Sequence, residues 1–137
     1  MEDKTFELTV MTPERVFFKG RALQLIVEAL DGSMGILKDM SPRIIGLEPG
    51  LMMLQRPDGS FAKASYGSGF VKADGDSVLM LVETAEWPEE IETERVRRTI
   101  EEKERQLHSR QKSKQEYLMC KAALARAFAR LKVKGEE

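Results

Sequence analysis

Thr84-Ala85-Glu86-Trp87-Pro88 is the stretch at which the character of this 137-residue chain changes. Glycine and proline punctuate the sequence before it, whereas Pro88 is the last proline and Gly135 is the only later glycine. Turn residues at high density break a chain into short strands, and their absence permits long helices. The sequence therefore predicts an α+β protein in which an N-terminal antiparallel β-sandwich (residues 1-86) is followed by a C-terminal antiparallel helical hairpin (residues 87-137).

Before this boundary the sequence carries the signals of short strands and tight turns. Apolar and polar residues alternate over residues 6–10 and 23–29, which is typical of half-buried strands. Two turn signals predict β-hairpins between residues 51–55 and 61–65 and between 67–72 and 78–83, namely Arg56-Pro57-Asp58-Gly59 and Ala73-Asp74-Gly75-Asp76. Many short strands at this spacing favour a sandwich or barrel and disfavour a doubly wound α/β fold.

After the boundary the sequence predicts a first helix that begins at Pro88. Proline suits the first helical position, and the glutamates that follow it suit the positive end of the helix dipole. The apolar residues of this helix are few, namely Ile91, Val96, Ile100 and Leu107. A hairpin with so thin an apolar face gains most of its stability from docking, which favours a mobile or partner-dependent element.

A second helix is predicted to begin at Ser113, which forms a capping-box pattern with Glu116. Residues 108–112 are then the connection between the two helices. The spacing places one set of side chains on one helical face and a strip of alanines beside it, in order Tyr117, Cys120, Leu124, Phe128 and Leu131, then Ala122, Ala125 and Ala129.

The composition limits the classes of protein to which the chain can belong. Its net charge of -1 lacks the basic excess of a nucleic-acid binder, so no nucleic acid is expected as a partner. A single cysteine, Cys120, excludes an intramolecular disulfide and fits a reducing compartment. The start Met1-Glu2-Asp3-Lys4 is unlike a signal peptide, and no apolar run approaches about 18 residues. Direct membrane insertion is therefore not expected.

The common signatures of an enzyme are missing from the sequence. There is no glycine-rich phosphate loop, no cysteine and histidine set with metal-ligand spacing, and no nucleophile elbow. We therefore expect no catalytic residues, no metal and no required cofactor.

Five stretches spread over nearly the whole chain form a recognisable series, namely Val10-Met11-Thr12-Pro13-Glu14-Arg15, Gly32-Ser33-Met34-Gly35-Ile36-Leu37, Leu47-Glu48-Pro49-Gly50, Ser68-Gly69-Phe70-Val71 and Ile91-Glu92-Thr93-Glu94-Arg95. In sequence and in order they resemble the epsilon subunit family of F-type ATP synthases. Each match alone is weak, but together they are specific. The resemblance also implies a β-sandwich followed by a helical hairpin.

The resemblance implies a non-catalytic central-stalk (rotor) subunit of the proton-translocating F-type ATP synthase. Such a subunit couples the catalytic head to the membrane ring, with the gamma subunit and the membrane rotor ring as partners. The ring contact is expected at Gly32, Ser33 and Met34, although the family has an acidic residue where this chain has Ser33. The expected location is peripheral, at the cytoplasmic face of a bacterial cell membrane. The hairpin can also contact catalytic-head subunits and inhibit ATP hydrolysis.

The resemblance further implies ATP as a possible regulatory ligand. The matching positions are Glu86, Ile91, Glu92, Arg95, Arg126 and Arg130. Arg126 and Arg130 are four residues apart and share a helix face, and guanidinium groups pair well with phosphates. The family has aspartate where this chain has Glu92, so binding is expected to be weak or absent. The alternative is that both arginines are ordinary solvated helix residues.

Two further alternatives remain open from the sequence. The charge run Glu101–Lys114, with basic residues such as Lys112 and Lys114, can be an electrostatic latch on acidic partner segments or a solvated helix face. The whole chain can also be a free-standing β-sandwich adaptor whose charged hairpin binds a protein or nucleic acid. The resemblance favours the rotor subunit over the adaptor.

Overall fold

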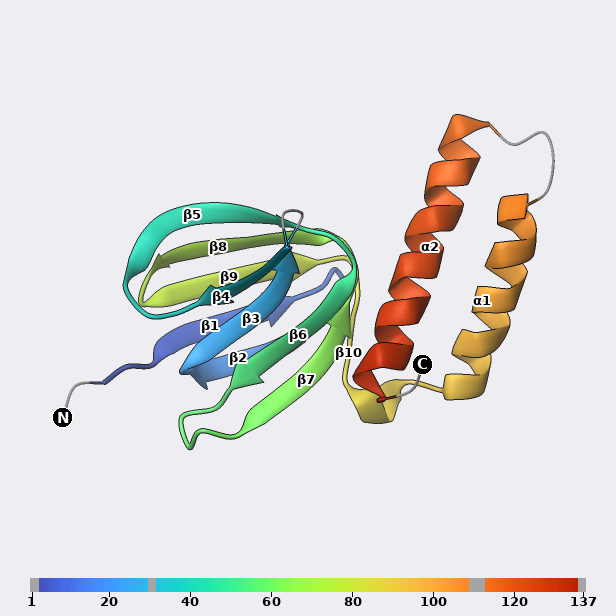
Figure 1. Cartoon of the computed structure of the whole chain (residues 1–137). Helices are drawn as coiled ribbons and strands as arrows, with labels where there is room; N and C mark the ends of the chain where they lie inside the picture. Colours follow the sequence, from blue (N-terminus) through green and yellow to red (C-terminus); the bar gives the residue numbers. More distant parts are fainter. Residues whose placement is uncertain (1–2, 30–31, 109–112, 136–137) are drawn as a thin grey trace.

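The structure is a computed structural model that describes residues 3–29, 32–108 and 113–135. Within these residues ten strands form a sandwich, and two helices form a hairpin beside one end of it (Figure 1). The strands are β1 (Phe6–Met11), β2 (Val16–Ala22), β3 (Gln24–Ala29), β4 (Gly32–Ile36), β5 (Met40–Leu47), β6 (Gly50–Gln55), β7 (Phe61–Tyr66), β8 (Gly69–Gly75), β9 (Ser77–Val82) and β10 (Ala85–Glu86). The 3-10 turn η1 (Pro88–Glu90) leads into α1 (Thr93–His108) and α2 (Lys114–Val133).

The sandwich has two layers that share one continuous ladder of strands. One layer has the order β10-β7-β6-β3 with β4 paired to β3, and the other has the order β5-β8-β9-β1-β2. The layers join where Ala29 on β3 pairs with Leu47 on β5. The pairings are antiparallel except that β1 lies parallel to β9. The predicted sandwich and hairpin are therefore confirmed, with one parallel pair inside the sandwich.

The alternating patterns in the sequence mark the faces that form the sandwich core. On β1 the buried side chains are Phe6, Leu8 and Val10, and on β3 they are Leu25 and Val27. Successive side chains of a strand point to opposite faces, so each alternation turns one row into the space between the layers. Burying a large apolar side chain contributes about 1.5–3 kcal/mol, which makes this interior the main source of stability.

Both predicted β-hairpins are present. Strands β6 and β7 pair from Gly50 opposite Tyr66 to Gln55 opposite Phe61, and Gly59 in their turn has φ 93°. Strands β8 and β9 pair up to Asp74 opposite Ser77, where Gly75 has φ 66°. Glycine adopts positive φ without steric cost, which is why these turn signals were informative.

The first helix begins later than the sequence predicts. Pro88 opens only the short turn η1, in which the Trp87 N–H donates to the Glu90 carboxylate over 2.9 Å. The backbone of Ile91 is then extended, with φ -96° and ψ 123°, and α1 begins at Thr93. The prediction that this long helix begins at Pro88 is therefore wrong. Pro88 starts only η1, because the extended backbone of Ile91 ends that turn before α1 begins.

The start of the second helix agrees with the sequence, but its buried face does not. Ser113 Oγ accepts the Glu116 N–H over 3.1 Å, as the capping pattern predicts. Leu124 and Leu131 are buried, whereas Tyr117 and Phe128 are 42% and 50% exposed. Of the predicted alanine strip only Ala129 is buried, while Ala122 is half-buried and Ala125 exposed.

The buried side chains of α2 follow from its two neighbours. The helix packs against α1 and also against β6 and β7, so it lies between the first helix and the sandwich (Figure 1). Ala127, Leu131 and Val133 join Val96 and Ile100 of α1 in one apolar cluster, against which Leu51 of β6 packs. This double contact turns Tyr117 and Phe128 to the edge of the buried face.

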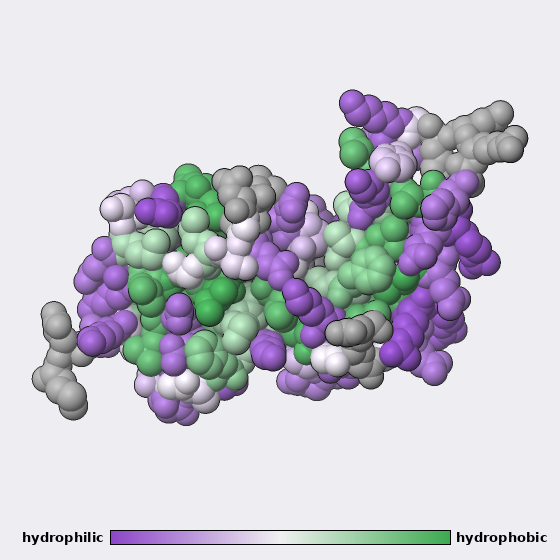
Figure 2. Space-filling view, in the orientation of Figure 1, coloured by the Kyte–Doolittle hydropathy of each residue, from purple (hydrophilic) through white to green (hydrophobic). Residues whose placement is uncertain are grey.

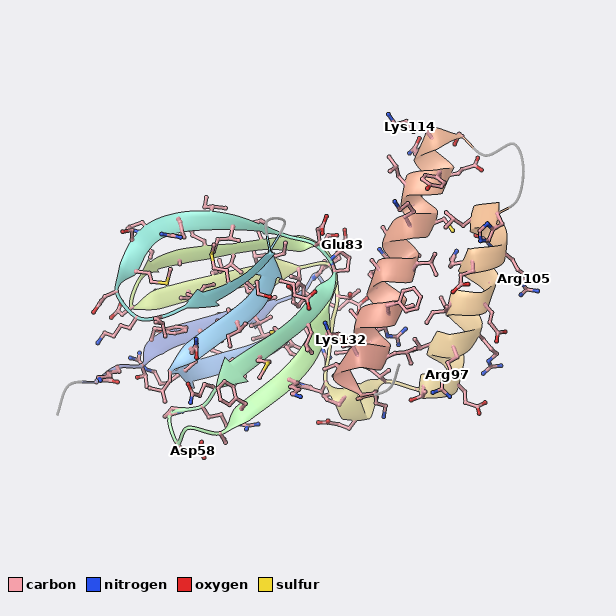
Figure 3. All side chains as sticks on the ribbon, in the orientation of Figure 1. Asp58, Glu83, Arg97, Arg105, Lys114 and Lys132 are labelled. Atoms are coloured by element: carbon pink, nitrogen blue, oxygen red, sulfur yellow. The ribbon has the colours of Figure 1, made fainter. Side chains whose placement is uncertain are left out.

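The charged residues of the hairpin gather on its outer surface. Hydrophilic side chains cover much of α1, whereas apolar side chains show through on the sandwich (Figure 2). Arg97 and Arg105 extend outward from α1, and Lys114 stands at the start of α2 (Figure 3). The expected connection after His108, and Lys112 within it, lie outside the described residues. Among the described residues, no helix combines the length and the apolar character needed to span a membrane.

Candidate functional site at the seam between sandwich and hairpin

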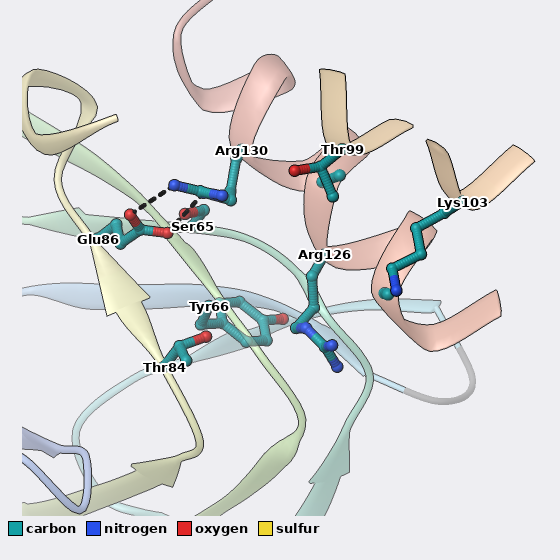
Figure 4. A pocket seen from close by; sticks show the side chains of 10 residues that line it. Ser65, Tyr66, Thr84, Glu86, Thr99, Lys103, Arg126 and Arg130 are labelled. Atoms are coloured by element: carbon teal, nitrogen blue, oxygen red, sulfur yellow. Dashed lines mark hydrogen bonds and ion pairs between the residues drawn. The ribbon is translucent and has the colours of Figure 1, made fainter. Parts of the chain in front are cut away.

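A cavity of about 270 Å³ lies between the sandwich and the hairpin (Figure 4). Polar side chains from four elements and the loop before β10 line it, namely Ser65 and Tyr66 of β7, Thr84, Glu86 of β10, Thr99 and Lys103 of α1, and Arg126 and Arg130 of α2. The lining carries three cationic groups and one carboxylate. A lining of this kind favours an anionic ligand.

Arg130 reaches from α2 to Glu86 and closes one side of the cavity (Figure 4). Its Nε lies 2.7 Å from Glu86 Oε1, and its Nη2 donates to Oε2 over 3.0 Å. The Nε–H is not aligned well enough on the carboxylate to count as a hydrogen bond, so this contact is an ion pair only. The two side chains are 25% and 27% exposed, which makes their pairing stronger than that of a surface pair.

Arg126 and Lys103 are bound less firmly than Arg130. Arg126 Nη1 lies 4.0 Å from Glu83 Oε2, at the limit of an ion pair. Lys103 Nζ donates to Gln106 on its own helix over 3.4 Å. Gly67 leaves room beside Arg126, because a Cβ at that position would come 2.8 Å from Thr84 Oγ1 and 3.5 Å from Arg126 Cδ. These two cations can turn toward a ligand at little cost.

Tyr66 gives the cavity a rigid wall. Its ring is buried, and its hydroxyl donates to the Glu28 carbonyl over 2.8 Å and accepts the Glu28 N–H over 2.7 Å. Burial raises the pKa of the Tyr66 phenol above its usual range, so the group stays neutral. Both hydrogen bonds connect β7 to β3. The Tyr66 hydroxyl is therefore used to stabilise the fold and is not free to bind a ligand.

The structure brings together Glu86, Arg126 and Arg130 from the predicted nucleotide site. The other three predicted residues do not line the cavity. Ile91 is buried in the apolar cluster of the hairpin, and Glu92 and Arg95 pair with each other over 3.7 Å at the start of α1, with side chains 72% and 71% exposed.

Sequence reasoning missed Thr99 and Lys103 as lining residues. They are four residues apart, so they share a face of α1. That spacing was visible in the sequence, but only the antiparallel pairing with α2 places this face opposite Arg126.

A second cavity, of about 550 Å³ and mostly apolar, lies on the outer face of the other layer of the sandwich. Three of its lining residues, Phe70, Leu81 and Met11, are paired across the neighbouring strands β8, β9 and β1. Phe70 is 39% exposed there. We call this surface the Phe70 groove.

The predicted ring-contact residues lie on β4, paired to β3. Gly32 has φ 119°, and Gly32 and Ser33 are exposed, whereas Met34 packs partly against the sandwich core. Two large apolar side chains on β5 and in the turn before it are also exposed, with Ile44 at 70% and Leu37 at 49%. The geometry is compatible with a contact surface at this side of the sandwich.

Known families match the chain in two adjoining parts. Residues 5–88 match the family described as ATP synthase, Delta/Epsilon chain, beta-sandwich domain, and residues 89–135 match its long alpha-helix domain. The ATP synthase epsilon chain of Caldanaerobacter subterraneus subsp. tengcongensis is 40% identical over 131 residues, covering 96% of this chain and 94% of that one. The ATP synthase epsilon chain of Ruminococcus albus is 37% identical over 133 residues, covering 96% and 98%.

Solved structures show the same fold at lower sequence identity. A chain in the mitochondrial ATP synthase of Euglena gracilis (OSCP/F1/c-ring) has a TM-score of 0.82 at 18% identity, covering 95% of this chain and 81% of that chain. A chain in the central stalk/c-ring of the Tetrahymena thermophila mitochondrial ATP synthase has a TM-score of 0.63 at 11% identity, covering 98% and 99%.

Proposed function

Because this chain belongs to the family of ATP synthase delta/epsilon chains, we propose that it is a non-catalytic central-stalk subunit that couples the catalytic head of the motor to its membrane ring. The observation that carries the proposal is the full-length match to ATP synthase epsilon chains, which includes both the sandwich and the hairpin. A free-standing adaptor would have no reason to retain both parts in this order. The subunit is then held at the cytoplasmic face of a bacterial membrane by its partners.

The Phe70 groove is the surface that best fits the gamma subunit. It is apolar and open, and exposed apolar patches of this kind mark protein interfaces. The ring contact is assigned to the β4 surface around Gly32, Ser33 and Met34, where the sequence resembles the family's glycine loop.

Affinity purification of the tagged full chain from its own cells in mild detergent tests this function. We expect gamma, catalytic-head and ring subunits to co-purify with it. Phe70→Glu should abolish co-purification, because it places a charge in the apolar groove. Phe61→Glu is the matched control, since Phe61 is similarly exposed on the other layer. Elution of the unmodified chain apart from an intact complex would disprove the proposal.

A regulatory role for the hairpin is a second part of the proposal. The cavity that α1 and α2 close against the sandwich carries Lys103, Arg126 and Arg130, an arrangement that suits a phosphate-bearing ligand such as ATP. A ligand held there would favour the docked hairpin, and loss of the ligand would release an arm able to slow hydrolysis. Comparing ATP hydrolysis by the assembled complex with and without residues 93–137 tests this role, and unchanged hydrolysis would remove it.

A further inference from the structure

The junction between the two parts of the chain is fastened to the sandwich by Arg15, which lies just before β2. Its Nη2 donates to Glu90 Oε1 over 2.8 Å and to the Ala85 carbonyl over 3.1 Å. The same Glu90 oxygen accepts the Trp87 N–H over 2.9 Å. Arg15 therefore binds β10 and η1 at once, across 70 and 75 residues of sequence.

Aromatic stacking adds a second fastening at the same place. Trp87 stacks on Phe17 of β2 with ring centroids 4.2 Å apart and an angle of 20° between the rings. The Arg15 guanidinium lies 5.1 Å from the centroid of the Phe17 ring. Trp87 thus packs against the core of the sandwich, whereas the hairpin has an apolar cluster of its own.

Ile91, the residue that follows η1, belongs to the hairpin. Ile91 is buried in the cluster formed by α1 and α2, and its extended backbone separates η1 from α1. The hairpin reaches the sandwich through separate contacts, which include the packing of Leu51 on its apolar cluster and the ion pairs of Arg130 with Glu86 and of Lys132 with Glu28, the latter over 3.4 Å. Neither Arg15 nor Phe17 takes part in those contacts.

We propose that Arg15 is a positioning residue that holds residues 85–90 on the sandwich, so that the hairpin pivots at Ile91–Glu92. The inference rests on the proposed movement of the hairpin, and it goes beyond it by locating the pivot. The change of composition at residues 84–88 does not mark the pivot, because Trp87 and Glu90 stay with the sandwich when α2 leaves.

Trp87 is the single tryptophan of the chain, so its fluorescence reports the junction directly. We would titrate the full chain with urea, following helix content by circular dichroism at 222 nm and Trp87 exposure by acrylamide quenching. The helical signal should fall at lower urea than the concentration at which Trp87 becomes exposed. In Arg15→Gln the fraction of molecules with Trp87 exposed should rise about tenfold before the sandwich unfolds, because a charge-assisted hydrogen bond is lost.

Two controls make the test specific. Arg21→Gln removes an arginine of β2 whose hydrogen bonds, among the described residues, go to Asp3 and Thr5 of the N-terminal segment, and it should change neither transition at the junction. Phe17→Leu keeps an apolar side chain but removes the stack, and should also expose Trp87 early. Coincident helix and Trp87 transitions in the unmodified chain, or an unchanged Trp87 transition in Arg15→Gln, would overturn the proposal. The urea titration does not measure ATP hydrolysis by the complex. A negative result here is therefore distinguishable from a failure of the proposed function.

Discussion

Arg130 and Glu86, 44 residues apart in the sequence, form a two-pronged ion pair across the seam between α2 and β10. The arginine that the sequence assigns to a phosphate ligand is therefore already engaged by a carboxylate. A bound anion has to compete with Glu86 for it. The same pair also helps to dock the hairpin, so ligand binding and hairpin position are linked through one side chain.

Arg130→Gln should weaken the docking of the hairpin by about 1–2 kcal/mol, because it leaves the partly buried Glu86 without its charged partner. The measurement is the urea midpoint of the helical signal in the isolated chain. Lys132→Gln is the matched control on the same helix. Its pair with Glu28 is more exposed, with the lysine side chain 67% accessible, so a loss below about 0.5 kcal/mol is expected. Equal losses in the two variants would contradict this assignment.

ATP should bind the isolated chain weakly or not at all, with a Kd above about 0.1 mM, or less than some 5.5 kcal/mol of binding free energy. Arg130 is engaged by Glu86, and Glu92 and Arg95 pair with each other away from the cavity. Calorimetric titration measures this directly. Tighter binding that Arg126→Ala abolishes would show that the cavity rearranges to accept the nucleotide.

Acid should loosen the junction at Trp87. Hydrogen bonds from Arg15 and from the Trp87 N–H hold the pKa of Glu90 below its ordinary value of 4.5. A carboxyl whose pKa is lower in the folded state adds stability above its unfolded pKa and loses that stability as pH falls through the folded pKa. Trp87 emission should therefore shift toward that of exposed tryptophan below about pH 4 in the unmodified chain. Glu90→Gln should show the shifted Trp87 emission already at neutral pH. Its emission should then change little as the pH falls, because the titrating carboxyl group is gone.

Asp39→Gly should stabilise the sandwich by about 0.5–1 kcal/mol. Asp39 has φ 64°, a left-handed conformation that glycine adopts without the cost paid by other residues. Its N–H donates to the Gly75 carbonyl over 2.9 Å, a bond that glycine retains. Urea unfolding measures the gain. Lys38→Gly, one residue earlier and without positive φ, should give no gain, and stabilisation by both changes would refute the explanation.

A fragment of residues 1–90 should fold cooperatively as a β-protein, and it should melt about 4–8 °C above a fragment of residues 1–86, the shift expected for about 1 kcal/mol. The longer fragment keeps the stack of Trp87 on Phe17 and the bond of Arg15 to Glu90. Thermal melting followed by circular dichroism compares the two. Equal melting temperatures would mean that the junction adds nothing to the sandwich, and a molten 1–90 fragment would contradict the division into two domains.

The sequence alone determined the elements whose signals are local. Alternation over residues 6–10 and 23–29, the Asp-Gly turn at Gly59 and the Ser113 cap each depend on a few neighbouring residues, and the structure confirms them. The ordered stretches between Val10 and Arg95 also resembled the family, which the matches over residues 5–88 and 89–135 bear out. Turns and caps of this kind depend on the chemistry of a few adjacent residues, so they can be predicted without knowing the tertiary structure.

Tertiary structure alone decided which side chains meet. Periodicity could place Phe128 on an apolar face, but not foresee that α2 would pack between two neighbours and leave it exposed. Arg130 pairs with Glu86, and Lys103 lines the same cavity. Arg15 donates to Glu90. All three contacts form only because segments distant in the sequence pack together. Such contacts depend on the relative placement of whole elements, and the free energy that selects that placement is summed over the entire core.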